Sequence, residues 1–173
     1  AIAKIAGIRL AQAYRRQFGR DYVSAMPTNL YWTGDNFDLQ SSHVLPALIR
    51  KAHEAKLSGA RTITIWGSGS PRREFLHADD CADACVFLLK NYSQDMHINV
   101  GSGEDVTILE LAEMVCEIVG FTVSIEKDES KPVGSPRKLM SAERIRALGW
   151  APSIALKTGI EQTYRWYREN ERR

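Results

Sequence analysis

Cysteine is scarce in this chain, long apolar runs are missing, and neither sign of charge dominates. Its 173 residues include only three cysteines, Cys81, Cys85 and Cys116, without the spacing of a zinc or redox motif. No apolar run reaches the roughly 18 residues that span a bilayer, and no cleavable signal is visible. A formal net charge of +2, from 23 basic and 21 acidic residues, predicts no nucleic-acid surface. These features favour a cytoplasmic protein without a metal, a membrane or a nucleic-acid partner.

Two cofactor-related patterns are also missing. Gly67-Ser-Gly69 is followed at the third-glycine position by Arg72, and Gly101-Ser-Gly103 is followed there by Val106, so neither forms a dinucleotide fingerprint. None of the six tyrosines has a lysine four residues later. Such a pair shares one helix face, and the lysine lowers the tyrosine pKa so that the phenol becomes a usable proton donor. The chain therefore has neither this pyrophosphate cradle nor this acid.

Strands alternate with helices along the chain, which predicts an α/β fold with a parallel sheet. Expected helices cover about 1–17, 42–56, 80–89, 107–119, 141–148 and 155–170, and expected strands cover 21–31, 62–66, 74–77, 98–100 and 121–125. Asp79 or Asp80 is expected to cap the third helix, and Thr107 with Glu110 forms a capping box. Cys81 and Cys85, one turn apart, are expected to pack in the apolar interior. The strand from residue 21 has few parallel neighbours, so its exposed edge favours a dimer or larger oligomer.

Seven stretches of the chain share the pattern of one enzyme family. They are residues 1–4, 26–31, 35–37, 42–48, 66–77, 99–101 and 131–138. From Ala1 to about Glu169 the chain resembles the GDP-L-fucose synthases, which are extended short-chain dehydrogenases of the NAD-dependent epimerase/dehydratase family. Ser42-His-Val-Leu-Pro-Ala and Lys131-Pro-Val-Gly-Ser-Pro-Arg-Lys point to these enzymes rather than to extended dehydrogenases in general.

The resemblance implies a fold, a reaction and a division of the chain. The fold would be the C-terminal part of a Rossmann-type dehydrogenase with its smaller α/β substrate domain. Residues 1–40 would be a remnant of the dinucleotide-binding domain, and residues 41–173 would mainly bind the nucleotide sugar, with segments returning to the Rossmann domain. In that family GDP-4-keto-6-deoxy-mannose is epimerised at C3 and C5 and reduced at C4 with NADPH, and the enzyme is expected to be a homodimer.

The resemblance also implies site residues. The implied catalytic residues are Lys4 and His43. The implied cofactor-binding residues are Lys4, Pro27, Asn29, Leu30 and His43. The implied substrate-binding residues are Asn29, Val44, Lys51, Trp66, Arg73 and Lys138. Lys4 would hold the nicotinamide ribose, and His43, whose pKa range suits proton transfer at carbon, would be the epimerisation acid. The forked guanidinium of Arg73 and the ammonium of Lys138 would bind the diphosphate.

Each assignment has a structural alternative. Lys4 alone also fits a solvated helix residue, His43 fits a helix cap or packing residue, and Trp66 fits a core position equally well. Arg72 is expected to be a solvated neighbour. The remaining histidines are expected to be structural, and they are His53, His77 and His97.

The sequence departs from the family pattern at three points. Trp32 and Thr33 stand where the family usually has Gly-Pro, Lys51 stands where it has arginine, and Ser141 stands where it has aspartate. Without the tyrosine acid, the opposing cysteine base and a cofactor phosphate site, the chain is expected to be a fragment that is inactive alone and does not hold NADP(H) tightly. Two alternatives stay open: a non-enzymatic module that binds nucleotide sugars or another subunit, and another sugar epimerase or reductase acting on UDP or dTDP sugars.

Overall fold

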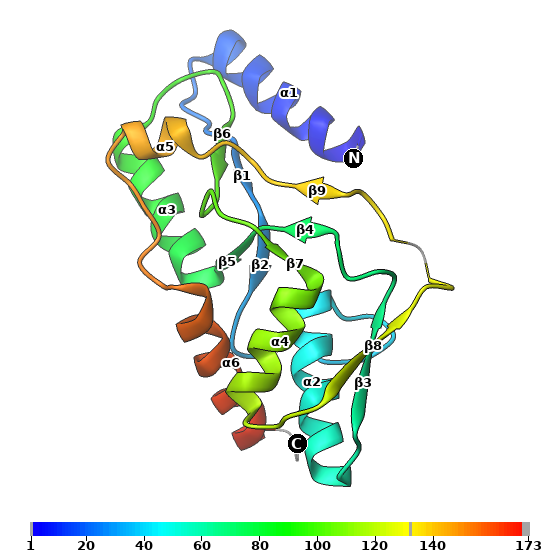
Figure 1. The fold of residues 1–173 in the computed structure, drawn as a ribbon. Helices are drawn as coiled ribbons and strands as arrows, with labels where there is room; N and C mark the ends of the chain where they lie inside the picture. Colours follow the sequence, from blue (N-terminus) through cyan, green and yellow to red (C-terminus); the bar gives the residue numbers. More distant parts are fainter. Residues whose placement is uncertain (1, 132, 171–173) are drawn as a thin grey trace.

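The computed structural model describes residues 2–131 and 133–170. The helices are α1 (Ile2–Phe18), α2 (Val44–Ser58), α3 (Ala78–Asn91), α4 (Ile108–Val119), α5 (Glu143–Ala147) and α6 (Leu156–Asn170). The strands are β1 (Ala25–Pro27), β2 (Asn29–Tyr31), β3 (Thr62–Trp66), β4 (Arg72–Arg73), β5 (Phe75–His77), β6 (Ile98–Val100), β7 (Val106–Thr107), β8 (Ser124–Asp128) and β9 (Arg137–Lys138). Figure 1 shows how they alternate, and the expected α/β class is confirmed.

Parallel pairing dominates the strands. β1 pairs with β6, β2 with β5, β3 with β8 and β4 with β9, all parallel, whereas β7 joins β4 antiparallel. β1 runs almost directly into β2 through Thr28, so one extended segment changes partner from β6 to β5 (Figure 1). Within the part of the chain that the structure describes, β6 is the only neighbour of β1. This segment carries the residues expected at the cofactor end of the site.

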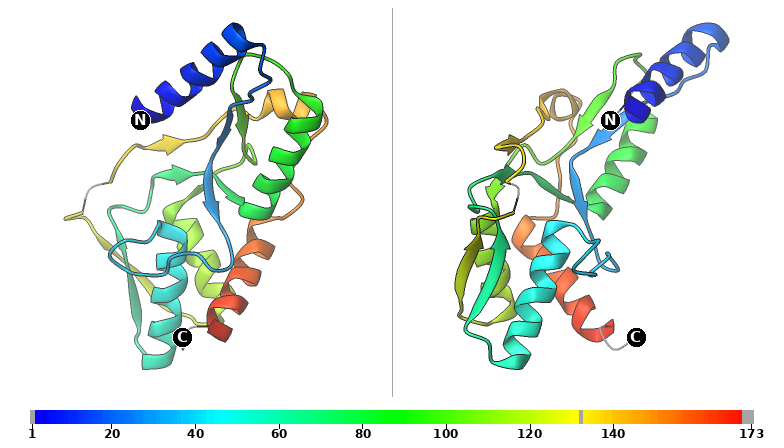
Figure 2. Two further views of the ribbon diagram at one scale, coloured as in Figure 1. Left: turned by 180° about the vertical axis from the view of Figure 1, so that it is seen from behind. Right: turned by 90° about the vertical axis from the view of Figure 1, so that its right-hand side faces the viewer.

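Two apolar cores hold these elements. In the larger core α2, α4 and α6 pack beside β3 and β8, and Ile49, Ile65 and Val115 are buried in it. In the second core Leu88 of α3, Ile98 of β6 and Ile145 of α5 are buried together. Figure 2 shows that the two groups of elements follow each other along an elongated molecule, and the short strands β4, β7 and β9 lie between them. The site is built at this junction.

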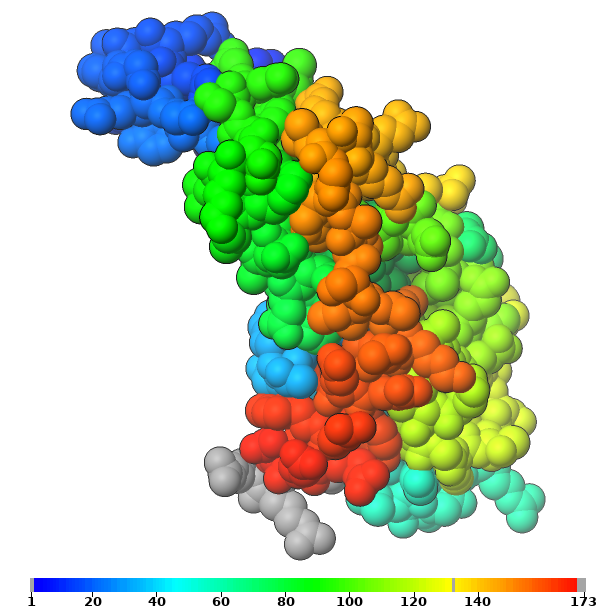
Figure 3. All heavy atoms as spheres, turned by 90° about the vertical axis from the view of Figure 1, so that its left-hand side faces the viewer, coloured from blue at the N-terminus to red at the C-terminus, as the bar shows by residue number. Residues whose placement is uncertain are grey.

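Helix α1 lies at one end of the molecule and is mostly exposed. Its attachment is polar: the Gln12 amide donates to the Asp95 carbonyl at 2.9 Å, and Arg15 contacts Asp21 and Ser93. Ile2 and Leu10 are 83% and 59% exposed, and Figure 3 shows the helix (blue) projecting from the end of the molecule. No helix among the described residues is long and apolar enough to span a membrane.

The capping residues predicted from the sequence are correct for α4 and wrong for α3. Thr107 and Glu110 form the expected capping box. The N-cap of α3, however, is His77, whose Nδ1 accepts the Asp79 N–H at 3.2 Å. The Asp80 carboxylate is instead buried and accepts hydrogen bonds from the backbone N–H groups of residues 153 and 154, so it is not available as a cap.

Two further expectations were wrong. β8 starts at Ser124 rather than at 121, because pairing with β3 begins where Ser124 faces Thr62 and Phe121 packs on the larger core. Cys81 is half-buried beside the second core, but Cys85, one turn later, is exposed. A spacing of four residues keeps both side chains near one helix face, and only the edge of that face reaches the core.

Candidate functional site

The site begins with four cations on two adjacent strands. In the parallel pair of β4 and β9, Arg72 faces Arg137 and Arg73 faces Lys138. Each pair of register partners points to the same side of the sheet, and successive residues alternate. The strands therefore present one pair of cations on each side.

One of these pairs is neutralised by Asp105. Its carboxylate, only 5% exposed, accepts from Arg137 Nε at 2.5 Å and from Arg72 Nε at 2.8 Å. The hydrogen bonds from Arg137 and Arg72 hold the pKa of Asp105 below its usual range. Arg72, expected to be a solvated neighbour, has a side chain that is 38% exposed, and it is also paired with Asp105. Within the described residues no ion pair involves Arg73 or Lys138, so these two cations remain available to an anion.

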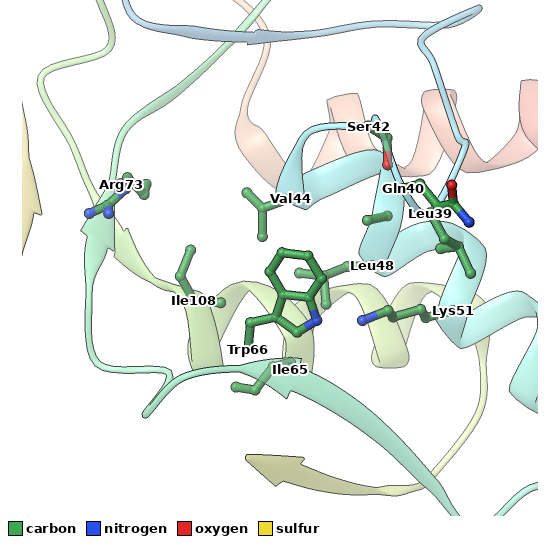
Figure 4. Close-up of a pocket in the computed structure, with 11 residues that line it drawn as sticks. Leu39, Gln40, Ser42, Val44, Leu48, Lys51, Ile65, Trp66, Arg73 and Ile108 are labelled. Atoms are coloured by element: carbon green, nitrogen blue, oxygen red, sulfur yellow. The ribbon is translucent and has the colours of Figure 1, made fainter. Parts of the chain in front are cut away.

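Trp66 lies at the centre of a cavity of about 280 Å³, here called the Trp66 cavity. Its lining residues are Leu39, Gln40, Ser42, Val44, Ala47, Leu48, Lys51, Ile65, Trp66, Arg73 and Ile108. Figure 4 shows the indole facing Val44 and Leu48 of α2, with the Lys51 amine pointing toward it and Arg73 at the far end. Four of the implied substrate residues thus share one cavity.

Two ammonium groups flank the Trp66 ring. Lys51 Nζ lies 5.9 Å and Lys131 Nζ 5.7 Å from the ring centroid, within cation–π range. Lys51 also donates to the Thr64 carbonyl at 2.9 Å, and burial lowers its pKa. Because Trp66 is 60% exposed, the alternative of a core role is wrong. Lys131 was not assigned a role from the sequence, although it begins one of the family-like stretches.

A second cavity, of about 580 Å³, is lined by the residues that the resemblance implies for catalysis and cofactor binding. It is here called the His43 cavity. Its lining residues are Lys4, Pro27, Thr28, Asn29, Leu30, Trp32, His43, Lys138, Leu139 and Met140. All five implied cofactor residues lie here, together with Lys138. Trp32, which departs from the family pattern, forms part of the wall. Thr28, Leu139 and Met140 were missed, and their only sequence signal was their position beside assigned residues.

The two cavities meet at the start of α2. His43 lines one and Val44, the next residue, lines the other. His43 is the N-cap residue with φ −72° and ψ 166°, but its side chain makes no cap hydrogen bond and is exposed. The alternative that its ring caps the helix is therefore wrong. Nearby, burial raises the pKa of the Asp35 carboxyl, and attraction to His43 partly offsets that effect.

The other histidines lie outside both cavities. His53 is buried, and its Nδ1 lies 3.1 Å from the Tyr164 hydroxyl. His77 is buried as the cap of α3. His97 lines a separate polar hollow beside Arg144. Within the described residues no cluster of three or more His, Cys, Asp or Glu side chains is arranged to hold a metal.

The chain belongs to the NAD dependent epimerase/dehydratase family, whose model matches residues 1–101. Within that family its similarity is to GDP-L-fucose synthases. It is 57% identical over 170 residues to the enzyme of Sinorhizobium fredii, covering 98% of this chain and 54% of that protein. It is 49% identical over 182 residues to the enzyme of Escherichia coli, covering 100% of this chain and 57% of that protein. The chain thus spans about half the length of the curated relatives it matches.

Solved structures of GDP-sugar enzymes share the fold of this chain. A GDP-L-fucose synthetase from Naegleria fowleri bound to NADP superposes with a TM-score of 0.88 at 27% identity, covering 95% of this chain and 54% of that one. A GDP-D-glycero-L-gluco-heptose synthase from Campylobacter jejuni, solved with NADPH, gives 0.85 at 35% identity, covering 98% and 59%. The Rossmann-type dehydrogenase fold expected from the sequence is confirmed by these neighbours.

Proposed function

We propose that this chain forms the GDP-sugar side of a GDP-L-fucose synthase active site, which epimerises GDP-4-keto-6-deoxy-mannose at C3 and C5 and reduces C4 with NADPH. The observation that carries the proposal is the pair of adjoining cavities with Arg73 lining one and Lys138 lining the other. The two residues are register partners. A nucleotide sugar has the same three parts in the same order: an aromatic base, a doubly charged linker and a polar ring.

The nucleoside would occupy the Trp66 cavity and the sugar the His43 cavity. The exposed indole of Trp66 offers a flat surface for a base, and Lys51 and Lys131 beside it favour an electron-rich partner. The diphosphate would cross between the cavities, where Arg73 binds two of its oxygens as a fork and Lys138 adds a point charge. Asp105 supports this role because it occupies Arg72 and Arg137 and leaves the other two cations free.

His43 would transfer the proton during epimerisation. It is exposed, unengaged in capping and near the buried Asp35 carboxyl. An imidazole ring can both carry and give up a proton, which suits proton transfer to the carbanion that forms beside the sugar carbonyl. Lys4 at the opposite wall would hold a ribose hydroxyl and orient the neighbouring groups.

The residues fit only the nicotinamide end of NADP. Pro27 and Leu30 form an apolar wall next to Lys4, which suits a flat ring with a ribose. No three-glycine turn exists within the 173 residues to bind the pyrophosphate. NADPH supplies the hydride when it is bound. Because the acid–lysine pair and this turn are missing, the 173-residue chain is expected to bind GDP sugars without turning them over.

The division of the chain and its assembly belong to the same proposal. Residues 1–40 would be a remnant of the dinucleotide-binding domain, and residues 41–173 would mainly bind the nucleotide sugar. Segments of the later part would return to the dinucleotide-binding domain, and the second core supports this because it packs Val23 and Leu30 with Ile98. The exposed α1, and β1 with one neighbouring strand among the described residues, support a homodimer or a complementing polypeptide.

Calorimetry tests the proposal directly. The chain is titrated with GDP, GDP-mannose, UDP and dTDP, and GDP and GDP-mannose are expected to bind tightest. Arg73→Ala is expected to weaken GDP binding about 10- to 100-fold, because a bidentate charged contact is lost. Binding that survives Arg73→Ala, or a preference for UDP or dTDP, would overturn the assignment.

A binding module without any turnover is the second candidate, and it would use the same contacts from Arg73 and Lys138. It is distinguished by mixing the chain with a polypeptide that carries the tyrosine, the cysteine base and the glycine-rich turn. NADPH oxidation in the presence of GDP-4-keto-6-deoxy-mannose is expected for the enzyme. A formed complex that remains silent would favour the binding module.

A further inference from the structure

Glu74 is a fully buried carboxylate at the centre of the site. It joins β4 to β5, immediately after Arg73, and its side chain is 0% exposed. Oε1 accepts the Gly103 N–H at 2.7 Å and the Ser102 hydroxyl at 3.4 Å, and Oε2 accepts the Met140 N–H at 3.2 Å. A buried charge is tolerated only when hydrogen bonds of this kind replace its water.

The backbone of Glu74 holds a third segment. Its carbonyl accepts the Asn29 side-chain amide at 2.7 Å and the Thr28 hydroxyl at 3.2 Å. Asn29 and Met140 both line the His43 cavity. One residue therefore fixes two of the walls of that cavity and is covalently attached to Arg73 in the neighbouring one.

The fit around this carboxylate is close. A Cβ built on Gly101 would lie 2.3 Å from Glu74 Oε1 and 2.9 Å from its carboxyl carbon. Only glycine at position 101 leaves the space that the carboxylate occupies. The side chain is thus held in one position and cannot move without disturbing the turn at 101–103.

We propose that Glu74 is the positioning residue of the nucleotide-sugar site: it sets the segment carrying Lys138 and Met140, and the Asn29 amide, against Arg73. This inference rests on the proposed function. A carboxylate can accept N–H groups from both Gly103 and Met140 at once, and charge-assisted bonds of this kind are about twice as strong as neutral ones. Glutamine has the same shape but turns a donor toward one of these N–H groups, so one contact becomes repulsive.

The test compares Glu74→Gln with Asp80→Asn. Asp80 is also a buried carboxylate, 3% exposed, and it accepts two backbone N–H groups from a distant segment, but it lines neither cavity. Both variants are expected to unfold at a lower temperature. Only Glu74→Gln is expected to weaken GDP binding, by about 10-fold, as one charged hydrogen bond is lost. Equal GDP affinities in the two folded variants would overturn the inference.

A double variant tests whether Glu74 acts through Lys138. Lys138→Ala is expected to lower GDP affinity by a smaller factor in the Glu74→Gln background than in the parent chain. An ammonium that is already displaced contributes less to binding. Full additivity would contradict the inference. Should Glu74→Gln fail to fold, Glu74→Asp keeps the charge but is too short to reach both N–H groups. It is expected to lose part of the GDP affinity, and undiminished affinity would overturn the inference.

These outcomes separate the two proposals. GDP binding that depends on Arg73 but not on Glu74 contradicts the positioning role alone. A parent chain that does not bind GDP contradicts the proposed function, and the positioning role, which rests on it, is then wrong as well.

Discussion

Arg73 and Lys138 are register partners in the parallel pair of β4 and β9, one lining the Trp66 cavity and the other the His43 cavity. Sixty-five positions separate them in sequence, by subtraction of 73 from 138. Two strands of two residues each are enough to bring both cations to the junction of the cavities. Because the pairing of β4 with β9 positions both cations, a substitution that shifts either strand is expected to alter the site without touching Arg73 or Lys138.

Lys51→Arg is expected to tighten GDP binding about 3- to 10-fold, since it supplies the forked donor that the family resemblance implies at this position. Lys51 already points toward the Trp66 cavity, so the longer guanidinium extends into the space that the ligand would occupy. Lys56→Arg on the same helix, where Nζ donates to the Val119 carbonyl at 2.6 Å, is the control and is expected to leave affinity unchanged. Calorimetry with GDP measures both, and weaker binding by Lys51→Arg would contradict the assignment of Lys51 to the substrate site.

Asp105→Asn is expected to destabilise the chain at neutral pH but not in acid. Arg137 and Arg72 lower the folded-state pKa of Asp105, so its contribution is present above the unfolded pKa of about 3.9 and is lost as the pH falls through the lower folded value. Urea unfolding at pH 7 should show the variant to be less stable. The two unfolding curves should converge at a pH below that folded value, and a difference that persists there would contradict the ionic origin.

Asp35→Asn is expected to have the opposite effect on the stability of the chain. Burial raises the folded-state pKa of Asp35, so the cost of ionising it grows as the pH rises above the unfolded pKa of about 3.9 and is complete above the folded value. The variant should be at least as stable as the parent chain at pH 7, and the gain should vanish near pH 3. Asp38→Asn, in the same loop, is the control, because the Ser41 hydroxyl lowers the Asp38 pKa and the variant should lose stability. Thermal unfolding measured at several pH values shows whether each variant gains or loses stability.

Gly159→Ala is expected to destabilise the chain by about 1–3 kcal/mol through overpacking, although alanine favours helices. Its Cβ would lie 2.1 Å from the Tyr31 hydroxyl oxygen, within the larger core. Tyr31→Phe should restore part of the loss, since the Tyr31 hydroxyl bonds the Leu156 carbonyl only at 3.5 Å. Gly7→Ala in α1 meets nothing within 4 Å and should stabilise by up to about 1 kcal/mol. Equal effects of the two Gly→Ala variants in urea unfolding would contradict the packing argument.

Periodicity and capping were sufficient to predict most of the helices and the parallel class. The capping box of Thr107 and Glu110 is a local signal, because both partners lie within one turn, and it was confirmed. The α3 cap was wrong because the carboxylate of Asp80 is committed to residues 153 and 154, a contact that no local pattern indicates. The start of β8 was wrong for the same reason, since its register depends on β3.

The implied site residues came from a family resemblance, and the structure brings them into two neighbouring cavities. The residues that sequence reasoning missed act through distant contacts. Asp105 contacts two arginines from different strands, and Glu74 contacts three segments that are far apart in the chain. Such groups have no spacing or composition of their own, so only the folded arrangement reveals them.

Helix α2 begins at the shared wall of the two cavities, with His43 facing one and Val44 facing the other. A ligand contact that stiffens this first turn from one cavity would also restrict the positions that the turn can adopt beside the other cavity. A ligand that filled both cavities would contact two consecutive residues of this turn, and any linkage between the two contacts would act equally in both directions. The position of the base in one cavity would in this way be tied, through one helical turn, to the position of the His43 ring in the other.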